Sequence, residues 1–303
     1  MTTHPLVVWQ LSDGKRGHER QAQGLIEALG TQTRLEKRLV PVRLLPGTLA
    51  LDALLRRAPA APLLPPPDVL VAAGRRTLWP AVCLRRIFRC RSICLMRPGA
   101  SRPWFDLSIV PQHDEPPTAS NIIVSEGPLN PFHPGPAQQA LGLVLLGGPS
   151  RHHAWDATTL LRQLSAVLKR TEGKDWIICT SRRTPPDFED ELAAWNFPRT
   201  RVMPFDAADE NWLVRHLPAA QEIWVSADSL SMIYEALTVT TSVGVLTLPE
   251  RRQDRVSRAV GNLIASAKVR TADAPTQLMT HEPLAEASRC AGLVLQRWPD
   301  LRR

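Results

Sequence analysis

The sequence predicts two α/β units, each built on a largely parallel sheet. Its 303 residues exceed the usual size of a single compact core. Short apolar runs alternate along the chain with segments whose apolar residues recur at helical spacing, which is typical of parallel sheets crossed by helices. Within the apolar runs polar residues rarely alternate with apolar ones, as expected of strands buried on both faces.

The predicted elements alternate in the same way in both halves of the chain. A helix is expected at 17–29, directly after the first strand, because its apolar residues fall on one face. Three further helices, at 155–170, 187–197 and 229–238, separate the strands of the second half for the same reason. The predicted strands cover 5–10, 38–45, 67–74, 91–96 and 105–111, and then 141–148, 175–181, 200–205, 222–228 and 242–248.

A proline-rich stretch at 127–139 marks the expected domain boundary. Its four prolines suit a stiff, extended linker better than the interior of a helix or strand. We therefore expect an N-terminal domain at 1–138 and a second domain at 139–265. Residues 266–303 are expected to form a C-terminal helical segment that packs back on the N-terminal domain.

Composition narrows the location of the protein. No apolar run approaches the roughly 18 residues that a membrane-spanning helix needs. The chain starts without an export signal, and its five cysteines, an odd number, indicate free thiols in a reducing compartment. We expect a cytoplasmic protein, with peripheral attachment to the cytoplasmic face of a membrane as an open alternative.

The positive charge lies mainly in the first half. Residues 1–138 hold 17 Lys and Arg against 10 Asp and Glu, a net charge of +7 out of +8 for the chain. In the stretch 75–91, Trp79 and Phe88 are interleaved with arginines. The stretch is either a helix with its apolar side on a sheet and its arginines in solvent, or a surface that docks on an anionic membrane. Nucleic acid is not an expected partner, because no binding motif is present and aromatic residues for base stacking are few.

Polar side chains follow several predicted strands, where parallel α/β sheets bind their ligands. In the second half, the start of helix 229–238 suits a phosphate, and Glu235 one turn further on suits a ribose diol. Arg182 and Arg183 offer planar forks for a diphosphate. Each feature also has a structural interpretation as a capped helix, surface arginines or a tight turn. The candidate nucleotide- and phosphate-binding residues are Gly147, Gly148, Ser150, Ser181, Arg182, Arg183, Asp228, Ser229, Ser231, Met232 and Glu235.

Two familiar nucleotide motifs are missing from the sequence. Neither the dinucleotide pattern G-x-G-x-x-G nor the phosphate loop G-x-x-x-x-G-K-[ST] occurs, which argues against a dehydrogenase or a kinase. An Asp-x-Asp metal motif is also absent. No cofactor and no metal ion are therefore expected.

Six ordered motifs carry a family resemblance. "DGKRGHERQ", "AAGRRT", "FDLSIVPQHD", "GGPSRHHAW", "TSRRTP" and "VSADSLSMIYEA" resemble the mitochondrial-fission ELM family, in its bacterial form, over about residues 6–265. Members of that family are similar to GT-B glycosyltransferases. The resemblance implies two Rossmann-like domains with an active cleft between them.

The resemblance also implies a function. We expect a metal-independent, inverting glycosyltransferase that moves a sugar from a nucleotide-diphosphate sugar, with a UDP-sugar as the expected donor, to an unknown acceptor such as a membrane glycolipid. Two alternatives remain open. One is a noncatalytic adaptor, as the plant branch of the family suggests, and the other is a sugar-nucleotide epimerase.

The opening stretch 12–21 would face the acceptor in such an enzyme. His18 or Asp13 is the expected general base, with His113 and Asp114 as a second candidate pair. A helix-capping or buried hydrogen-bonded histidine is the structural alternative for His18. The remaining expected acceptor-loop residues are Gly14, Lys15, Gly17, Gln21, Gly74, Arg75 and Arg76.

Overall fold

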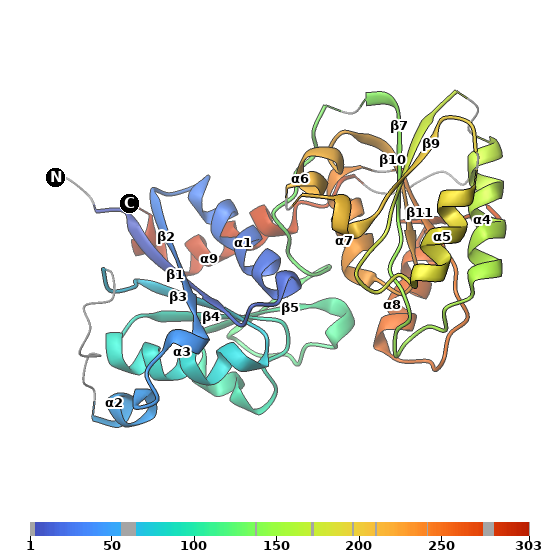
Figure 1. The fold of residues 1–303 in the computed structure, drawn as a ribbon. Helices are drawn as coiled ribbons and strands as arrows, with labels where there is room; N and C mark the ends of the chain where they lie inside the picture. Colours follow the sequence, from blue (N-terminus) through green and yellow to red (C-terminus); the bar gives the residue numbers. More distant parts are fainter. Residues whose placement is uncertain are drawn as a thin grey trace. The chain divides into compact units, whose positions relative to one another are not determined.

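The computed structural model shows two α/β units (Figure 1). Unit 1 comprises Met1–Pro131 together with Ala285–Arg303, and unit 2 comprises Phe132–Leu284. Each unit contains a six-stranded sheet in which every pair of neighbouring strands is parallel, so the predicted α/β class is confirmed. The structure describes residues 4–55, 65–136, 138–170, 173–195, 197–209, 211–240, 242–274 and 282–302.

The division between the units differs from the boundaries expected at 138 and 265. It falls earlier within the proline-rich stretch because Phe132, only 3% exposed, already packs in the core of unit 2. At the other end, residues up to Leu284 stay with unit 2. There the short strand β12 (Arg270–Thr271) pairs with the edge strand β11 (Val243–Leu246). The return to unit 1 therefore starts at Ala285 rather than at 266.

The sheet of unit 1 has the strand order β2-β1-β3-β4-β5-β6. Helices α1 (Arg16–Gly30) and α9 (Glu286–Arg297) pack on one face, and α2 (Leu49–Leu55) and α3 (Arg75–Phe88) pack on the other. The strands are β1 (Leu6–Ser12), β2 (Leu35–Pro41), β3 (Val69–Ala73), β4 (Arg91–Leu95), β5 (Leu107–Pro111) and β6 (Ile122–Ser125).

Helices α1 and α9 are held on the sheet by apolar stripes. Ala22, Leu25, Ile26 and Leu29 of α1 recur at helical spacing, and each is at most 1% exposed. Gly24 lets α1 approach the chain closely, since a Cβ there would lie 2.4 Å from the carbonyl of Asn130. The α9 stripe of Cys290, Ala291, Val294 and Leu295 is fully buried in the same core.

The sheet of unit 2 has the order β12-β11-β10-β7-β8-β9. In Figure 1, α4 (Ala157–Arg170) and α5 (Pro186–Ala194) lie on one side of it, and α7 (Leu230–Val239) and α8 (Arg255–Ala265) on the other. The remaining elements are β7 (Gln138–Leu145), β8 (Asp175–Cys179), β9 (Thr200–Met203), β10 (Ala220–Ser226), α6 (Trp212–His216) and the 3₁₀ turns η1 (Val42–Leu44), η2 (Gly99–Trp104), η3 (Gln112–Asp114), η4 (Phe205–Ala207) and η5 (Pro299–Leu301).

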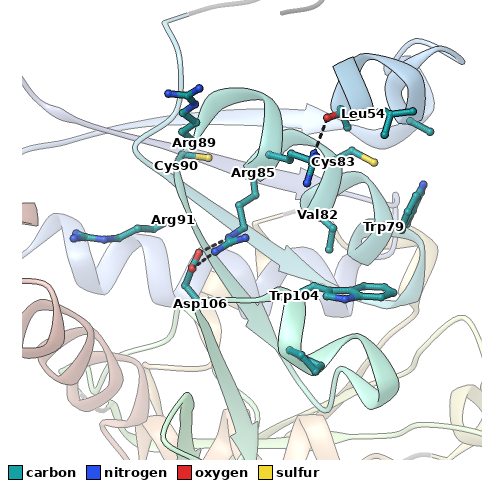
Figure 2. A pocket seen from close by; sticks show the side chains of 14 residues that line it. Leu54, Trp79, Val82, Cys83, Arg85, Arg89, Cys90, Arg91, Trp104 and Asp106 are labelled. Atoms are coloured by element: carbon teal, nitrogen blue, oxygen red, sulfur yellow. Dashed lines mark hydrogen bonds and ion pairs between the residues drawn. The ribbon is translucent and has the colours of Figure 1, made fainter. Parts of the chain in front are cut away.

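The basic stretch 75–91 forms α3 and then β4. The helix buries Thr77, Ala81, Cys83 and Leu84 against the sheet, but Trp79 stays 56% exposed. Beside Trp79 is a pocket of about 920 Å³ lined by residues of α2, α3 and η2, which we call the α2–α3 pocket (Figure 2). Within the described ranges, no helix is both long and apolar enough to cross a bilayer.

Candidate functional site

Each sheet has a point at which the strand order reverses. In unit 1 the reversal lies between β1 and β3, and in unit 2 it lies between β7 and β10. Loops leaving neighbouring strands there turn toward opposite faces of the sheet, which opens a binding crevice at the carboxyl ends of the strands. The predicted residues after β1, β3, β7 and β10 are therefore brought to these two points.

At the switch point of unit 1, His18 and Asp13 form a pair. His18 Nδ1 lies 3.0 Å from Asp13 Oδ2 and 3.2 Å from Oδ1. The Asp13 side chain is 1% exposed, whereas that of His18 is 24% exposed. A carboxylate that engages Nδ1 fixes the ring and leaves Nε2 available to accept a proton. The pair thus has the arrangement that a general base requires.

Gly74 makes room for this pair from the neighbouring strand. It follows β3 with φ of 91°, in the left-handed region that favours glycine. A Cβ at this position would lie 2.1 Å from His18 Nδ1 and 3.0 Å from Asp13 Oδ2. The glycine therefore lets the His18 ring pack directly against the backbone of the β3–α3 loop.

The loop after β1 is braced by its own polar groups. The Ser12 hydroxyl contacts the Glu19 carboxylate and accepts a hydrogen bond from the amide of Gly14 at 3.0 Å. Gln10, 2% exposed, donates from Nε2 to the Glu19 carbonyl. The amide of Lys15 donates to Asp13 Oδ1 at 3.1 Å. These contacts hold the Asp13 carboxylate in place.

The other expected acceptor-loop residues differ in their positions. Lys15, Gly17, Arg75 and Arg76 are exposed at the starts of α1 and α3. Gly14, with φ of 79°, forms the turn before α1. Gln21 points elsewhere and donates to the sulfur of Met96.

The second candidate pair lies away from the switch point. His113 and Asp114 are on η3 after β5, and β3 and β4 separate β5 from β1 in the sheet. His113 Nε2 is 3.9 Å from Asp114 Oδ1, too long for a hydrogen bond. Their geometry supports a general base less well than that of His18 and Asp13.

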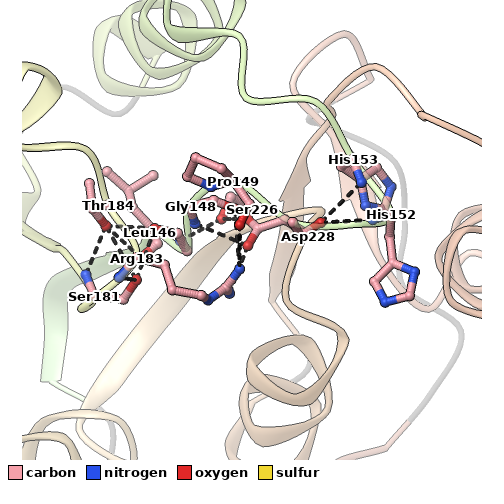
Figure 3. Close-up of polar contacts among 12 residues, drawn as sticks. Leu146, Gly148, Pro149, His152, His153, Ser181, Arg183, Thr184, Ser226 and Asp228 are labelled. Atoms are coloured by element: carbon pink, nitrogen blue, oxygen red, sulfur yellow. Dashed lines mark hydrogen bonds and ion pairs between the residues drawn. The ribbon is translucent and has the colours of Figure 1, made fainter.

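In unit 2, the Gly147–Gly148 turn after β7 is pinned to the loop after β10 (Figure 3). The amide of Gly147 donates to Ser226 Oγ at 2.8 Å, and that of Gly148 donates to Asp228 Oδ2 at 3.0 Å. A Cβ on Gly147 would lie 2.1 Å from Asp228 Oδ2. The two glycines therefore permit close approach between protein loops. Their amides are occupied by protein acceptors instead of being free for a phosphate.

Asp228 gathers the polar contacts of this switch point. Its buried carboxylate also accepts from Ser226 Oγ at 2.6 Å and pairs with Arg183 Nη2 at 2.8 Å. The Arg183 side chain remains 44% exposed. Ser181 and Thr184, from the same loop after β8, donate to the Gly147 carbonyl at 2.9 Å and 2.6 Å. Three loops are thereby tied together around one carboxylate.

Arg182 faces a different environment from Arg183. Its guanidinium is exposed and lies 5.7 Å from the centre of the Phe205 ring. Because Asp228 already neutralises Arg183, Arg182 is the cation of this loop with no carboxylate partner among the described residues. The two arginines that the sequence treats alike have different roles in the structure.

The start of α7 completes the site in unit 2. Ser229 occupies the N-cap, but its side chain makes no capping hydrogen bond, so the positive end of the helix lacks a side-chain acceptor from that residue. Ser231 is exposed and Met232 half-buried on the first turn. Glu235 follows on the next turn and is 7% exposed.

The structure adds a His–Asp pair that sequence reasoning did not select. Ser150 accepts from the amides of His152 and His153 and so shapes the loop after the two glycines. His152 Nδ1 lies 2.5 Å from Asp254 Oδ2, and Asp254 also caps α8. Burial opposes ionisation of Asp254, but hydrogen bonds from His152 and from the amides of Ser257 and Val256 outweigh it and lower its pKa. The "RHH" letters were visible in the sequence, but their partner is about 100 residues away.

His153 differs from His152 in its surroundings. It is 2% exposed, and burial is the main cause that lowers its pKa. Its Nδ1 has no hydrogen-bond partner among the described residues. Over the same ranges, no group of three His, Cys, Asp or Glu side chains gathers as a metal site would require.

Comparison with solved structures identifies the fold. S. aureus MnaA, solved with UDP, matches with a TM-score of 0.51 and 12% identity over 97% of each chain. A Listeria monocytogenes protein described as a putative UDP-N-acetylglucosamine 2-epimerase matches with a TM-score of 0.55 and 12% identity, covering 98% of this chain and 90% of its own. An O-GlcNAc transferase from Thermobaculum terrenum has a TM-score of 0.48 and 14% identity, over 98% and 68%. No curated protein matches the sequence.

Two Rossmann-like units, each with a parallel sheet and a polar switch point, define a protein of the GT-B fold class. The model of the family described as mitochondrial fission ELM1 matches residues 16–298. The chain therefore belongs to the mitochondrial fission ELM1 family, which confirms the resemblance stated from its motifs.

Proposed function

We propose that the protein is a glycosyltransferase that uses a nucleoside-diphosphate sugar, with a UDP-sugar as donor. The observation that carries the proposal is the unit 2 switch point, where the uncapped start of α7 meets the loops after β7 and β8. Helix N-termini and arginine side chains are suited to a diphosphate. The UDP in the S. aureus MnaA structure, bound to a protein of the same fold, supports this choice of donor.

On the donor side, Arg182 and the first-turn amides of α7 would bind the diphosphate. Glu235 would accept hydrogen bonds from the ribose hydroxyls. The Arg183–Asp228 pair would position the loops, since its charges already balance each other. No metal ion enters this scheme, and the positive groups of the protein stabilise the leaving diphosphate.

On the acceptor side, His18 would be the general base and Asp13 would orient it. The acceptor hydroxyl oxygen attacks the anomeric carbon while the bond from that carbon to the diphosphate oxygen breaks. The hydroxyl proton moves to His18 Nε2, and the electron pair leaves with the diphosphate. This single displacement inverts the anomeric centre. The exposed aromatic and basic residues of α3 favour an acceptor held at an anionic membrane surface, such as a glycolipid.

The test is nucleotide binding by thermal shift and calorimetry, comparing UDP, GDP, ADP, TDP and CMP. Binding to the native state raises the unfolding temperature. UDP should stabilise the protein most, and Arg182→Ala should weaken UDP binding, whereas Arg201→Ala, an exposed arginine on β9, should not. If none of the five nucleotides binds, the proposal is wrong, and the noncatalytic adaptor becomes the better interpretation.

A sugar-nucleotide epimerase is the second candidate, favoured by the likeness to the Listeria monocytogenes protein. The two activities are separated by incubating the protein with a UDP-sugar alone. An epimerase would change the sugar while it stays attached to UDP. A transferase would release UDP, slowly to water and faster when an acceptor is added.

A further inference from the structure

The α2–α3 pocket of unit 1 combines apolar walls with exposed aromatic side chains. Leu54 of α2 and Val82 of α3 line it, and Trp79 and Trp104 lie beside them (Figure 2). The two indole rings meet edge to face, with centres 6.1 Å apart, and are 56% and 49% exposed. Aromatic pairs favour this edge-to-face arrangement. The pocket therefore has an exposed aromatic edge.

Apolar exposure continues along α2. Leu51, Leu54 and Leu55 are 54%, 67% and 47% exposed, although leucines are usually buried. Leu54 lines the pocket together with the two tryptophans, and Leu51 and Leu55 lie near it on the same helix. Clusters of this kind mark interaction sites when polar groups border them.

Arginines border the pocket, and they differ in how they are paired. Arg85 is held by both oxygens of Asp106, and Arg86 Nε donates to the carbonyl of Ala53 at 2.9 Å. Arg76 and Arg89 are exposed and form no ion pair within the part of the chain that the structure describes. The paired arginines shape the pocket. Arg89 leaves positive charge at its border, and Arg76 adds positive charge one helical turn before Trp79 on α3.

We propose that the α2–α3 pocket is the site at which unit 1 docks on an anionic membrane. Trp79, Trp104 and Leu54 enter the interface between headgroups and acyl chains, and the pocket receives part of an acyl chain. Arg76 and Arg89 contact lipid phosphates. Apolar wedges with neighbouring basic residues bind anionic lipid surfaces, and charge complementarity selects them over neutral ones.

This inference rests on the proposed function, in which the acceptor is held at a membrane surface. Docking would keep the acceptor-side loop of unit 1 near its substrate. Lipid binding itself requires neither a donor nor turnover. Vesicle binding and UDP binding can therefore fail independently.

The first test is sedimentation of the full chain with vesicles of phosphatidylcholine, with and without phosphatidylglycerol. We expect binding to the anionic vesicles, weaker at high salt because exposed charges are screened. The double variant Arg76→Gln/Arg89→Gln should bind about 30-fold more weakly, since each arginine contributes about 1 kcal/mol near such a surface. Arg34→Gln/Lys37→Gln removes the same charge from exposed positions of unit 1 outside the pocket and should change binding much less.

The second test places an environment-sensitive fluorophore on Leu54→Cys, with Val214→Cys on α6 as the control at a similarly exposed site, 49% exposed. Brief labelling favours the new thiol, because burial raises the pKa of Cys90 to about 12 and four native cysteines are buried. Anionic vesicles should shift the emission from position 54 to the blue and leave position 214 unchanged. Equal binding to neutral vesicles, no binding, or binding without a shift at position 54 would overturn the proposal.

Discussion

The imidazole of His18 is fixed by the carboxylate of Asp13, with Nδ1 3.0 Å from Oδ2. The carboxylate is itself buried, whereas a quarter of the His18 side chain reaches solvent. This relationship joins residues on either side of the turn between β1 and α1, and it suits proton transfer through Nε2.

The first prediction concerns this pair. His18→Ala should reduce turnover by roughly 10²–10⁴, because a positioned base contributes about that factor. Asp13→Asn should also reduce turnover, because Asp13 acts through His18 in the same proton transfer. The double variant should therefore lose little more turnover than the more impaired single variant. The measurement is UDP release from a UDP-sugar, with calorimetry to show that UDP affinity is kept. His133→Ala, an exposed histidine outside the site, serves as the control and should retain activity.

Gly74→Ala tests the packing around the same pair. The added Cβ would meet His18 Nδ1 at 2.1 Å, and φ of 91° is unfavourable for alanine. We expect a loss of about 1–3 kcal/mol in the free energy of unfolding together with reduced turnover. Gly17→Ala provides the comparison, because nothing lies within 4 Å of its added Cβ. Equal stability of the two variants in urea unfolding would contradict the close contact.

In unit 2, Gly147→Ala should separate the loops around Asp228. Its Cβ would lie 2.1 Å from Asp228 Oδ2, and the neighbouring amide bonds leave no room for a shift. The free energy of unfolding should fall by about 1–3 kcal/mol, and UDP binding should weaken. Gly47→Ala, where the Cβ would meet open space, should behave like the parent protein. An unchanged UDP affinity in Gly147→Ala would show that the loop does not position the nucleotide.

The stability of unit 2 should depend on pH through Asp254. Its pKa is lowered in the folded state, so its contribution is present above the unfolded value of about 3.9 and is lost as the pH falls below it. Asp254→Asn keeps a capping side chain but loses the ionised partner of His152. Urea unfolding should therefore show a smaller decrease in stability between neutral pH and about pH 3 for the variant. Asp273→Asn, at an exposed position, should retain the steep decrease of the parent protein.

Glu235→Ala should weaken UDP binding by about 1–3 kcal/mol if its carboxylate accepts hydrogen bonds from the ribose. The residue is 7% exposed on α7, so stability without nucleotide must be measured alongside affinity. Glu235→Gln keeps the size and one acceptor and should lose less. Calorimetry with the same affinity in all three proteins would remove Glu235 from the proposed site.

The fold was predictable where the sequence carries a local signal. All ten predicted strands have counterparts. Most are compact apolar runs buried in a parallel sheet, whereas the edge strands β2 and β9 are only partly buried. Strands β6 and β12 were not predicted. β12 has only two residues, and β6, although apolar over Ile122–Val124, has only four and is shorter than any of the predicted strands. Helix α2 exposes leucines, which hides the periodicity of a buried face.

The candidate site was predictable only in part. The association of polar loops with strand ends follows from topology, so His18 and the loops around Gly147 could be selected from the sequence. Partners far along the chain could not, as the pairs Arg183–Asp228 and His152–Asp254 show. The sequence also offers no sign that the glycine amides would be used internally, because that depends on where the Asp228 carboxylate points.

The return of α9 to unit 1 has a consequence for synthesis. Unit 2 is one continuous segment, whereas unit 1 needs Ala285–Arg303 to cover α1. During synthesis on the ribosome, the part of the apolar stripe of α1 that packs against α9 therefore stays uncovered until all of unit 2 has been translated. Unit 2 can therefore finish folding before unit 1, although the synthesis of unit 1 begins first.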